Sequence, residues 1–240
     1  MEYHGHVLRN ELKYLINDLE YTSLKSKLKT IMKLDKNTGD EGEYHVRSLY
    51  FDDLMNTAYD EKEGGVFHRK KYRIRIYNKD EGFISLEKKE KFGKYVSKTS
   101  RSISKDLYYN ILKKTHNFNE FKDDSFLLEF YLETKMKGLE PVVIVDYIRE
   151  PYVYKYGNVR ITFDKNLQTL INTNDIFERL PLYASPFLDG AMILEIKYDE
   201  YLPELIRREL KMSHHQLLAV SKYTICRDFK NSIYWKERIL

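Results

Sequence analysis

Arginine and lysine occupy every second position in several short segments of this sequence. In the clearest segment, Lys71, Arg73 and Arg75 alternate with a tyrosine and two isoleucines. Because successive side chains of a β-strand point to opposite faces, this segment predicts a strand with one cationic and one apolar face. Four further segments follow the same design, with charged or polar faces that comprise Arg9, Glu11 and Lys13; Ser85, Glu87, Lys89 and Lys91; Arg160, Thr162 and Asp164; and Glu195 and Lys197. Guanidinium and ammonium groups bind phosphate oxygens well, so the pattern favours a phosphorylated ligand.

Positive charge is concentrated in one part of the chain. The 240 residues carry a formal charge of +4, with 41 Lys and Arg against 37 Asp and Glu. Residues 69–105 alone contain 13 Lys and Arg against 4 Asp and Glu, so the rest of the chain is net negative. A solvated basic surface is the simplest interpretation of such a run, and an anionic ligand is the alternative.

The arrangement of the charges favours the anionic ligand. A sheet with one face in water explains the alternation, but not why its polar face carries so few Ser, Thr, Asn and Gln residues. Buried cations without matching negative charge cost several kcal/mol each, so converging basic faces require a polyanion such as a triphosphate or a longer phosphate chain. A closed barrel, with helices over its apolar outer faces, would enclose these groups in a charged tunnel.

Three glutamates interrupt the basic faces. Glu11, Glu87 and Glu195 cannot attract phosphate, but carboxylates suit a divalent cation that bridges phosphate oxygens. The alternative is a plain salt bridge from each glutamate to the lysine two residues further along its strand.

The elements that must position these residues give an α+β domain that spans residues 1–240 without a linker or repeat. Hydrophobic periodicity, helix-capping residues and turn residues predict about eight antiparallel strands with helices between them. The predicted strands cover residues 7–16, 44–52, 68–78, 83–91, 94–103, 142–152, 158–165 and 191–199. The predicted helices cover residues 18–32, 54–63, 105–112, 124–137, 203–210 and 216–235, and residues 167–189 are expected to be irregular. Asn17 or Asp18 is expected to cap the first of these helices and Ser104 the third, and Gly138 is expected to end the fourth.

Composition excludes several classes of protein. Cys226 is the single cysteine, so neither an internal disulfide nor a cysteine-rich zinc site is expected. The amino terminus does not resemble a signal peptide, and no apolar run approaches the length of a membrane span, so a cytoplasmic location is expected. A nucleic-acid-binding sheet would place aromatic residues on its basic face, whereas Tyr14, Tyr72 and Phe163 fall on the opposite faces.

Seven motifs occur in a fixed order along the chain, and together they resemble one known family. The motifs are Arg9-x-Glu11-x-Lys13-Tyr14, Ser48-Leu-Tyr50-Phe-Asp52, Lys71-Tyr-Arg73-Ile-Arg75-x-Tyr77, Leu86-Glu87-x-Lys89, Arg160-Ile-Thr162-Phe-Asp164, Leu194-Glu195-x-Lys197-Tyr198 and Ser221-Lys222-Tyr223. This set resembles the VTC domain, which is the polyphosphate polymerase domain of the vacuolar transporter chaperone complex. That domain is a member of the triphosphate tunnel metalloenzyme, or CYTH, superfamily. The resemblance covers residues 7–229.

The resemblance implies a fold, an activity and a set of site residues. The fold is an eight-stranded antiparallel β-barrel that encloses a basic tunnel, with helices packed outside. The activity is transfer of the γ-phosphoryl group of ATP to a growing inorganic polyphosphate chain, with Mn²⁺ or Mg²⁺ as cofactor. Carried onto this sequence, the catalytic cations are Lys13, Arg73, Arg75, Lys89, Arg160, Lys197 and Lys222. The further substrate-binding residues are Arg9, Lys71, Lys98, Tyr50 and Arg149, and the metal ligands are Glu195, Glu11 and Glu87.

One departure from the wider superfamily favours synthesis over hydrolysis. The hydrolytic tunnel enzymes typically begin with Glu-x-Glu-x-Lys, whereas the first glutamate position is Arg9 here, as in the VTC branch. A tri- or polyphosphatase and a non-catalytic polyphosphate-binding module remain the alternatives. On this interpretation an Arg73→Ala and Lys197→Ala variant loses synthesis and keeps its fold.

The expected partners are ATP and inorganic polyphosphate, with no nucleic acid. No SPX domain precedes the predicted barrel and no transmembrane helix follows it, so the sequence resembles the stand-alone bacterial type. Coupling of synthesis to translocation would then require a separate membrane partner, which would place the protein at the inner face of the membrane.

Overall fold

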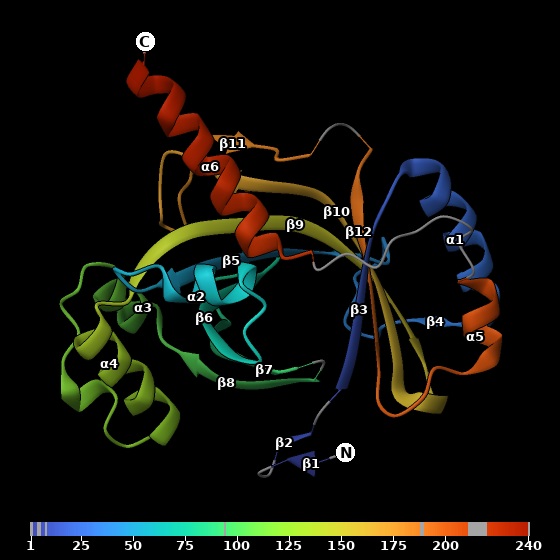
Figure 1. The fold of residues 1–240 in the computed structure, drawn as a ribbon, viewed down its shortest axis with the longest axis horizontal. Helices are drawn as coiled ribbons and strands as arrows, with labels where there is room; N and C mark the ends of the chain where they lie inside the picture. Colours follow the sequence, from blue (N-terminus) through green and yellow to red (C-terminus); the bar gives the residue numbers. More distant parts are fainter. Residues whose placement is uncertain are drawn as a thin grey trace.

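In this computed structural model, eight antiparallel strands form a closed hydrogen-bonded ring. Figure 1 shows how the strands and helices are arranged in space. The structure describes residues 2–3, 6–7, 9–93, 95–187, 190–210 and 220–239. The strands of the ring are β3 (Arg9–Ile16), β5 (Tyr44–Asp52), β6 (His68–Tyr77), β7 (Ile84–Phe92), β8 (Tyr95–Ile103), β9 (Glu140–Tyr154), β10 (Val159–Leu170) and β12 (Met192–Tyr198). Their order is β3-β8-β7-β6-β5-β9-β10-β12, and β12 pairs again with β3. The predicted fold class is therefore confirmed.

Helices and four short strands complete the fold. They are α1 (Asp18–Ile31), α2 (Thr57–Glu63), α3 (Lys105–Leu112), α4 (Ser125–Lys137), α5 (Glu204–Glu209), α6 (Lys222–Ile239), β1 (Glu2–Tyr3), β2 (His6–Val7), β4 (Lys33–Leu34) and β11 (Tyr183–Ala184). The expected caps are present: Asn17 and Ser104 accept hydrogen bonds from backbone N–H groups of α1 and α3, and Gly138 ends α4 in the left-handed region. Among the described residues, no helix is long and apolar enough to span a membrane.

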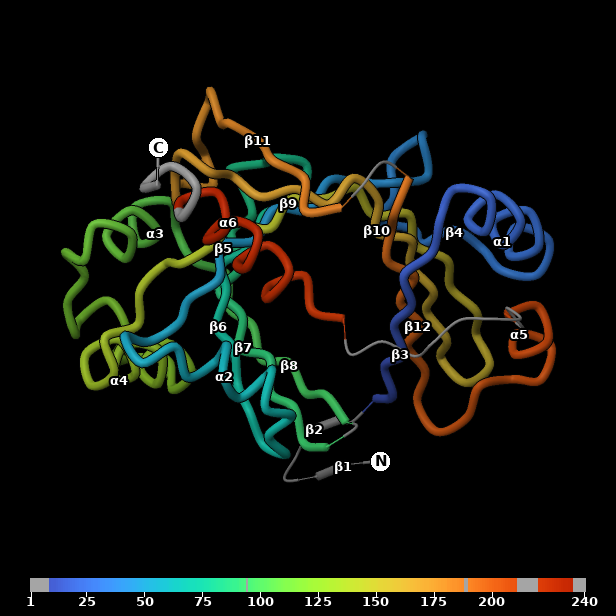
Figure 2. Tube along the Cα trace, turned by 45° about the horizontal axis from the view of Figure 1, so that its top comes forward, coloured from blue at the N-terminus to red at the C-terminus, as the bar shows by residue number. Residues whose placement is uncertain are grey.

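The outer faces of the ring are apolar and lie under two groups of helices. On one side α3 and α4 cover β5–β8, where Ile74 belongs to the same buried cluster as Phe130 of α4. On the other side α1 and α5 cover β3, β10 and β12, where Ile196 belongs to the same buried cluster as Leu28 of α1. Figure 2 shows these two groups at opposite sides of the molecule. Where apolar and charged residues alternate along the strands, the apolar side chains under these helices thus face outward and the cations that line the cavity face inward.

Helix α6 differs from the other helices because it packs against the inner faces of β9 and β10. Its Tyr223 and Cys226 lie in one buried cluster with Val145 of β9 and Leu167 of β10. Tyr147, on the same face of β9 as Val145, lines the interior cavity. The first residues of α6, which include the predicted site residue Lys222, therefore reach the interior of the ring.

Strand β10 is longer than its hydrophobic pattern predicts. The sequence predicts a strand that ends at Lys165, whereas β10 continues to Leu170. Its register against β9 shifts between Lys165 and Gln168, where the pairing is irregular. This irregularity breaks the period-two pattern that the sequence prediction followed, because an extra residue moves the later side chains to the opposite face.

A buried glutamate fixes α1 to the ring, and its removal is expected to destabilise the protein. Glu150 accepts hydrogen bonds of 2.6 Å from Tyr21 and Tyr152, and pairs with Lys25 and Lys165 at 3.0 and 3.2 Å. Burial raises the pKa of Glu150, but these partners outweigh it and lower the pKa from 4.5 to about 2. Glu150→Gln should therefore lower the free energy of unfolding at neutral pH by about 3 kcal/mol.

The pH dependence of this loss has a defined sign. A carboxyl group with a lowered pKa in the folded state stabilises fully above its unfolded pKa, and the stabilisation disappears as the pH falls towards the folded value. In urea unfolding, the gap between wild type and Glu150→Gln should therefore narrow below about pH 4.5. Glu43→Gln is the control, because Glu43 contacts the same Lys165 from a more exposed position. A gap that stays constant with pH would contradict this account.

Candidate functional site

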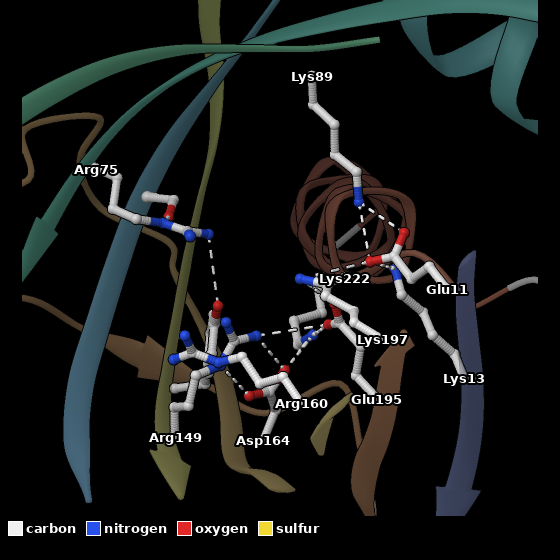
Figure 3. A network of polar contacts seen from close by, with 12 residues as sticks. Glu11, Lys13, Arg75, Lys89, Arg149, Arg160, Asp164, Glu195, Lys197 and Lys222 are labelled. Atoms are coloured by element: carbon white, nitrogen blue, oxygen red, sulfur yellow. Dashed lines mark hydrogen bonds and ion pairs between the residues drawn. The ribbon is translucent and has the colours of Figure 1, made fainter. Parts of the chain in front are cut away.

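The inner faces of the ring line a cavity of about 330 Å³. Eleven Lys and Arg side chains line it, against two carboxylates. The charged lining residues are Glu11, Lys13, Lys62, Arg69, Lys71, Arg73, Arg75, Lys89, Lys91, Arg149, Glu195, Lys197 and Lys222, joined by Tyr50, Tyr147 and Tyr223. Figure 3 shows side chains from β3, β6, β7, β9, β12 and α6 that point towards one another here.

Strand β6 contributes two arginines with different partners. Arg73 forms an ion pair with Glu87 at 2.6 Å and donates to the Tyr50 hydroxyl at 3.0 Å. Arg75 is buried, and it donates to the hydroxyls of Ser48 at 2.9 Å and Tyr147 at 3.4 Å. Among the described residues, Arg75 has no carboxylate within ion-pair distance. Its positive charge is therefore free to act on a ligand.

Strands β3 and β12 place opposite charges next to one another. Glu195 lies opposite Lys13 in the register, and Lys197 lies opposite Glu11. Glu11 pairs with Lys89 of β7 at 2.8 Å, and Glu195 pairs with Lys197 at 2.6 Å. Burial raises the pKa of each carboxyl, but the surrounding lysines outweigh it, so the pKa of both Glu11 and Glu195 is lowered. Both groups are therefore anionic at neutral pH.

A buried aspartate pairs with two further cations that line the cavity. Asp164 of β10 accepts two hydrogen bonds from Arg149, at 2.7 and 2.8 Å, and pairs with Lys222 at 2.5 Å. Arg149 and Lys222 also lie 3.5 and 3.7 Å from Glu195 (Figure 3). Because Lys222 is the first residue of α6, Asp164 connects the start of this helix to the ring.

Two lysines have a strongly lowered pKa in the free cavity. Burial, together with Lys62, Arg69 and other cations, lowers the pKa of Lys71 to about 6. Burial lowers the pKa of Lys89 to about 7, with Lys13 and Lys197 acting in the same direction. These shifts follow from crowding of like charges away from water. They indicate that the cavity carries more positive charge than its own carboxylates compensate.

The residues present fit a divalent cation at one position. Glu11 and Glu195 lie diagonally opposite one another on one face of the β3–β12 pair, two positions apart in the register, and each carboxyl influences the pKa of the other. Two such carboxylates are a common protein contribution to a Mg²⁺ site that phosphates complete. The buried hydroxyl of Thr162 lies opposite Glu195 in the register and has no hydrogen-bond partner among the described residues. No group of three or more His, Cys, Asp or Glu that could hold a metal ion occurs within the described chain.

Four of the sequence-predicted site residues do not line the cavity. Arg9 pairs with Asp199 at 2.9 Å, Arg160 with Asp35 at 2.9 Å, and Lys98 with Glu87 at 3.1 Å. Glu87 is itself occupied by Arg73 and Lys98, so it compensates cations instead of facing a metal. Strand parity assigned Arg9, Glu87 and Arg160 to the inner face but not to a depth along it, whereas Lys98 was assigned from the resemblance alone. The other eleven predicted residues come together as cavity-lining groups.

The structure adds cavity residues that the motifs missed. Arg69 and Lys91 share the parity of their neighbours Lys71 and Lys89. The alternation had already assigned Lys91 to the charged face of its strand, and it could have identified Arg69 in the same way. Lys62 belongs to α2 and Tyr147 to β9. The continuous apolar run of β9 has no alternation, so the sequence does not show which of its side chains face inward. No signal in the sequence indicated that Lys62 reaches this cavity.

Comparison with known proteins identifies one matching family and several similar structures. A model of the VTC domain matches residues 8–229. A putative adenylyl cyclase from Hippeastrum, described as having a dominant triphosphatase activity, is 13% identical, with 92% of this chain and 95% of that chain covered and a TM-score of 0.51. A putative adenylate cyclase from Bacillus halodurans is 14% identical, with 80% and 81% covered and a TM-score of 0.47. A protein from Pyrococcus horikoshii is 15% identical, with 92% and 99% covered and a TM-score of 0.47. No curated protein matches the chain.

Proposed function

Because the chain belongs to the VTC domain family, we propose that it transfers the γ-phosphoryl group of ATP to an inorganic polyphosphate chain inside the cavity. The observation that carries the proposal is the excess of cations, since eleven Lys and Arg face two carboxylates in about 330 Å³. Only a ligand with several negative charges compensates such a lining.

The cavity residues perform the transfer by holding and neutralising phosphates. Phosphoryl transfer passes through a loose transition state, so the protein must align the donor and acceptor and stabilise charge on the peripheral oxygens. Arg73 and Arg75 of β6 face the same cavity as Arg149 and Lys222, and we place the triphosphate between these two groups. The guanidinium forks are preorganised by their partners, which lowers the cost of reorganisation during transfer.

Glu11 and Glu195 would hold Mn²⁺ or Mg²⁺ in this proposal. When bound, the ion supplies Lewis-acid stabilisation of phosphate oxygens. The acceptor is a phosphate oxygen that is anionic near neutral pH, so the protein need not supply a general base. Accordingly, no histidine lies among the described cavity residues.

Hydrolysis of triphosphate or polyphosphate is the second candidate, and Lys89 favours it. A lysine with a pKa of about 7 is able to remove a proton from water. A bound phosphate chain, however, adds negative charge near this ammonium group and therefore raises its pKa. The base is thus lost when the substrate binds, and transfer to a phosphate acceptor remains the better proposal.

Phosphorus NMR of the purified protein with ATP and Mn²⁺ separates the two activities. Transfer predicts a growing signal from internal chain phosphates together with ADP, and a short polyphosphate primer shows whether an acceptor is required. Lys70→Gln is the control variant, because Lys70 lies on the outer face of β6 and pairs with Glu133 of α4. Orthophosphate as the only product would replace the proposal with hydrolysis.

A further inference from the structure

Four cations at one end of the cavity lack the compensation that the others have. Lys62, Arg69, Lys71 and Lys91, here called the outer cluster, all line the cavity. Among the described residues, Arg69, Lys71 and Lys91 have no carboxylate within ion-pair distance. Within the described part of the chain, the carboxylate that lies within ion-pair distance of Lys62 is that of the neighbouring Glu63, at 3.4 Å. Most inner cations, in contrast, pair with Glu11, Glu87, Asp164 or Glu195.

The outer cluster continues the basic stripe of β6 and β7 towards the surface. Lys71 lies opposite Lys89 in the register, and Arg69 lies opposite Lys91. Exposure increases along β6, from the buried Arg75 to the half-buried Arg69. Arg69 lies six positions before Arg75, which corresponds to about 20 Å of extended strand. A triphosphate is shorter than this stripe and covers only part of it.

Lys71 occupies the centre of the outer cluster and is surrounded by like charges. The groups that face it are Lys62 of α2, Arg69 of its own strand, Lys89 of β7 and Lys13 of β3. On the side of α6, its ammonium group lies 4.3 Å from the centre of the Tyr223 ring. This ring offers a weak cation–π contact, but it does not neutralise the charge. The arrangement is therefore incomplete until an anion joins it.

We propose that the outer cluster binds further phosphates of a linear chain, beyond the three that lie between Arg73 and Arg75 on one side and Arg149 and Lys222 on the other. The cavity would therefore select inorganic polyphosphate over triphosphate. This inference rests on the proposed function, because it takes the inner end as the triphosphate site. It assigns a chain-length preference to four residues, of which only Lys71 belongs to the recognised motifs.

Calorimetric binding without metal tests the preference, with tripolyphosphate and long-chain polyphosphate as probes at one salt concentration. The variant Arg69→Gln with Lys71→Gln should bind the long chain about 10- to 100-fold more weakly, because two charge-assisted contacts are lost. Its affinity for tripolyphosphate should change by less than about threefold. The matched control is Lys70→Gln with Lys88→Gln, which removes two charges from the outer faces of the same strands.

The conservative variant Lys71→Arg gives a readout that a purely structural role would not move. At about pH 7.5, a lysine with a pKa near 6 is mostly neutral and must take up a proton when a polyanion binds. Titrations in buffers of different ionisation heat should show this uptake for wild type with the long chain. In Lys71→Arg the uptake should fall by up to about one proton while the affinity is retained, because arginine stays charged.

Three outcomes would overturn the inference. If the variant lost equal affinity for tripolyphosphate and for the long chain, the outer cluster would belong to the triphosphate site. If the outer-face control lost the same affinity for the long chain, the preference would reflect unspecific charge attraction. Equally tight binding of a DNA oligonucleotide of similar charge would lead to the same conclusion. Failure of the proposed transfer is distinguishable, because it would abolish turnover in NMR while the difference between the two phosphate probes persists.

Discussion

Replacing Arg75 with glutamine is expected to lower the rate of phosphoryl transfer by about 100- to 1000-fold, which is the usual effect of removing one preorganised donor from a charge-stabilising site. Arg75 is buried in the cavity, and its partners are the hydroxyls of Ser48 and Tyr147. Replacing Arg75 leaves no buried carboxylate without an ion-pair partner, and it eliminates a positive charge that is shielded from water. The thermal unfolding midpoint should therefore stay unchanged or rise.

Arg73 is the informative contrast to Arg75. The sequence alone suggested that Arg73→Ala, combined with Lys197→Ala, would remove synthesis and leave the fold intact. The structure shows that Arg73 compensates the buried Glu87, whose other ion-pair partner is the half-exposed Lys98. Arg73→Gln should therefore lose about 3–5 kcal/mol of stability, and its loss of activity would not report on the cavity alone. An Arg75→Gln protein that transfers phosphate at the parent rate would refute the assignment of the inner site.

Replacing Glu195 with glutamine is expected to lower metal-dependent transfer by about 100-fold or more, since loss of a metal ligand removes several kcal/mol of charge stabilisation. The fold should tolerate the change, because Arg149 and Lys222 keep Asp164 as their partner. Binding of polyphosphate without metal should stay equal or become tighter, since one repelling carboxylate is gone. Rates measured across a Mn²⁺ titration, together with metal-free binding, check both parts.

Glu90 provides the control for Glu195. It lies on the outer face of β7, where it contacts Lys88 at 3.3 Å. Glu90→Gln should leave the Mn²⁺ dependence unchanged. If Glu195→Gln kept the parent response to Mn²⁺, the metal position would have to be sought elsewhere in the cavity.

Strand parity determined most of the fold and much of the candidate site. Period-two patterns such as the one around Arg73 and Arg75 predicted an apolar and a charged face for five strands. In the structure, helices pack on the apolar faces of these strands. The capping signals of Asn17 and Ser104 located two helix starts, because these contacts lie within four residues of one another. Such features are local, so the sequence contains the information they need.

Contacts between distant residues were decided only by the tertiary structure. The sequence assigned Arg160 and Glu87 to the inner face, but their depth and their partners depend on where other strands end. Lys62 of α2 and Lys222 of α6 also line the cavity, and their positions depend on how these two helices pack against the ring. Ion pairs connect side chains of different elements, as between Arg73 of β6 and Glu87 of the neighbouring β7, or between Lys222 of α6 and Asp164 of β10. The sequence therefore determined which cations of the alternating strands face inward. The tertiary structure decided which helix cations join them, and which cations are compensated or remain available to a ligand, because compensation requires a carboxylate that packing brings within reach.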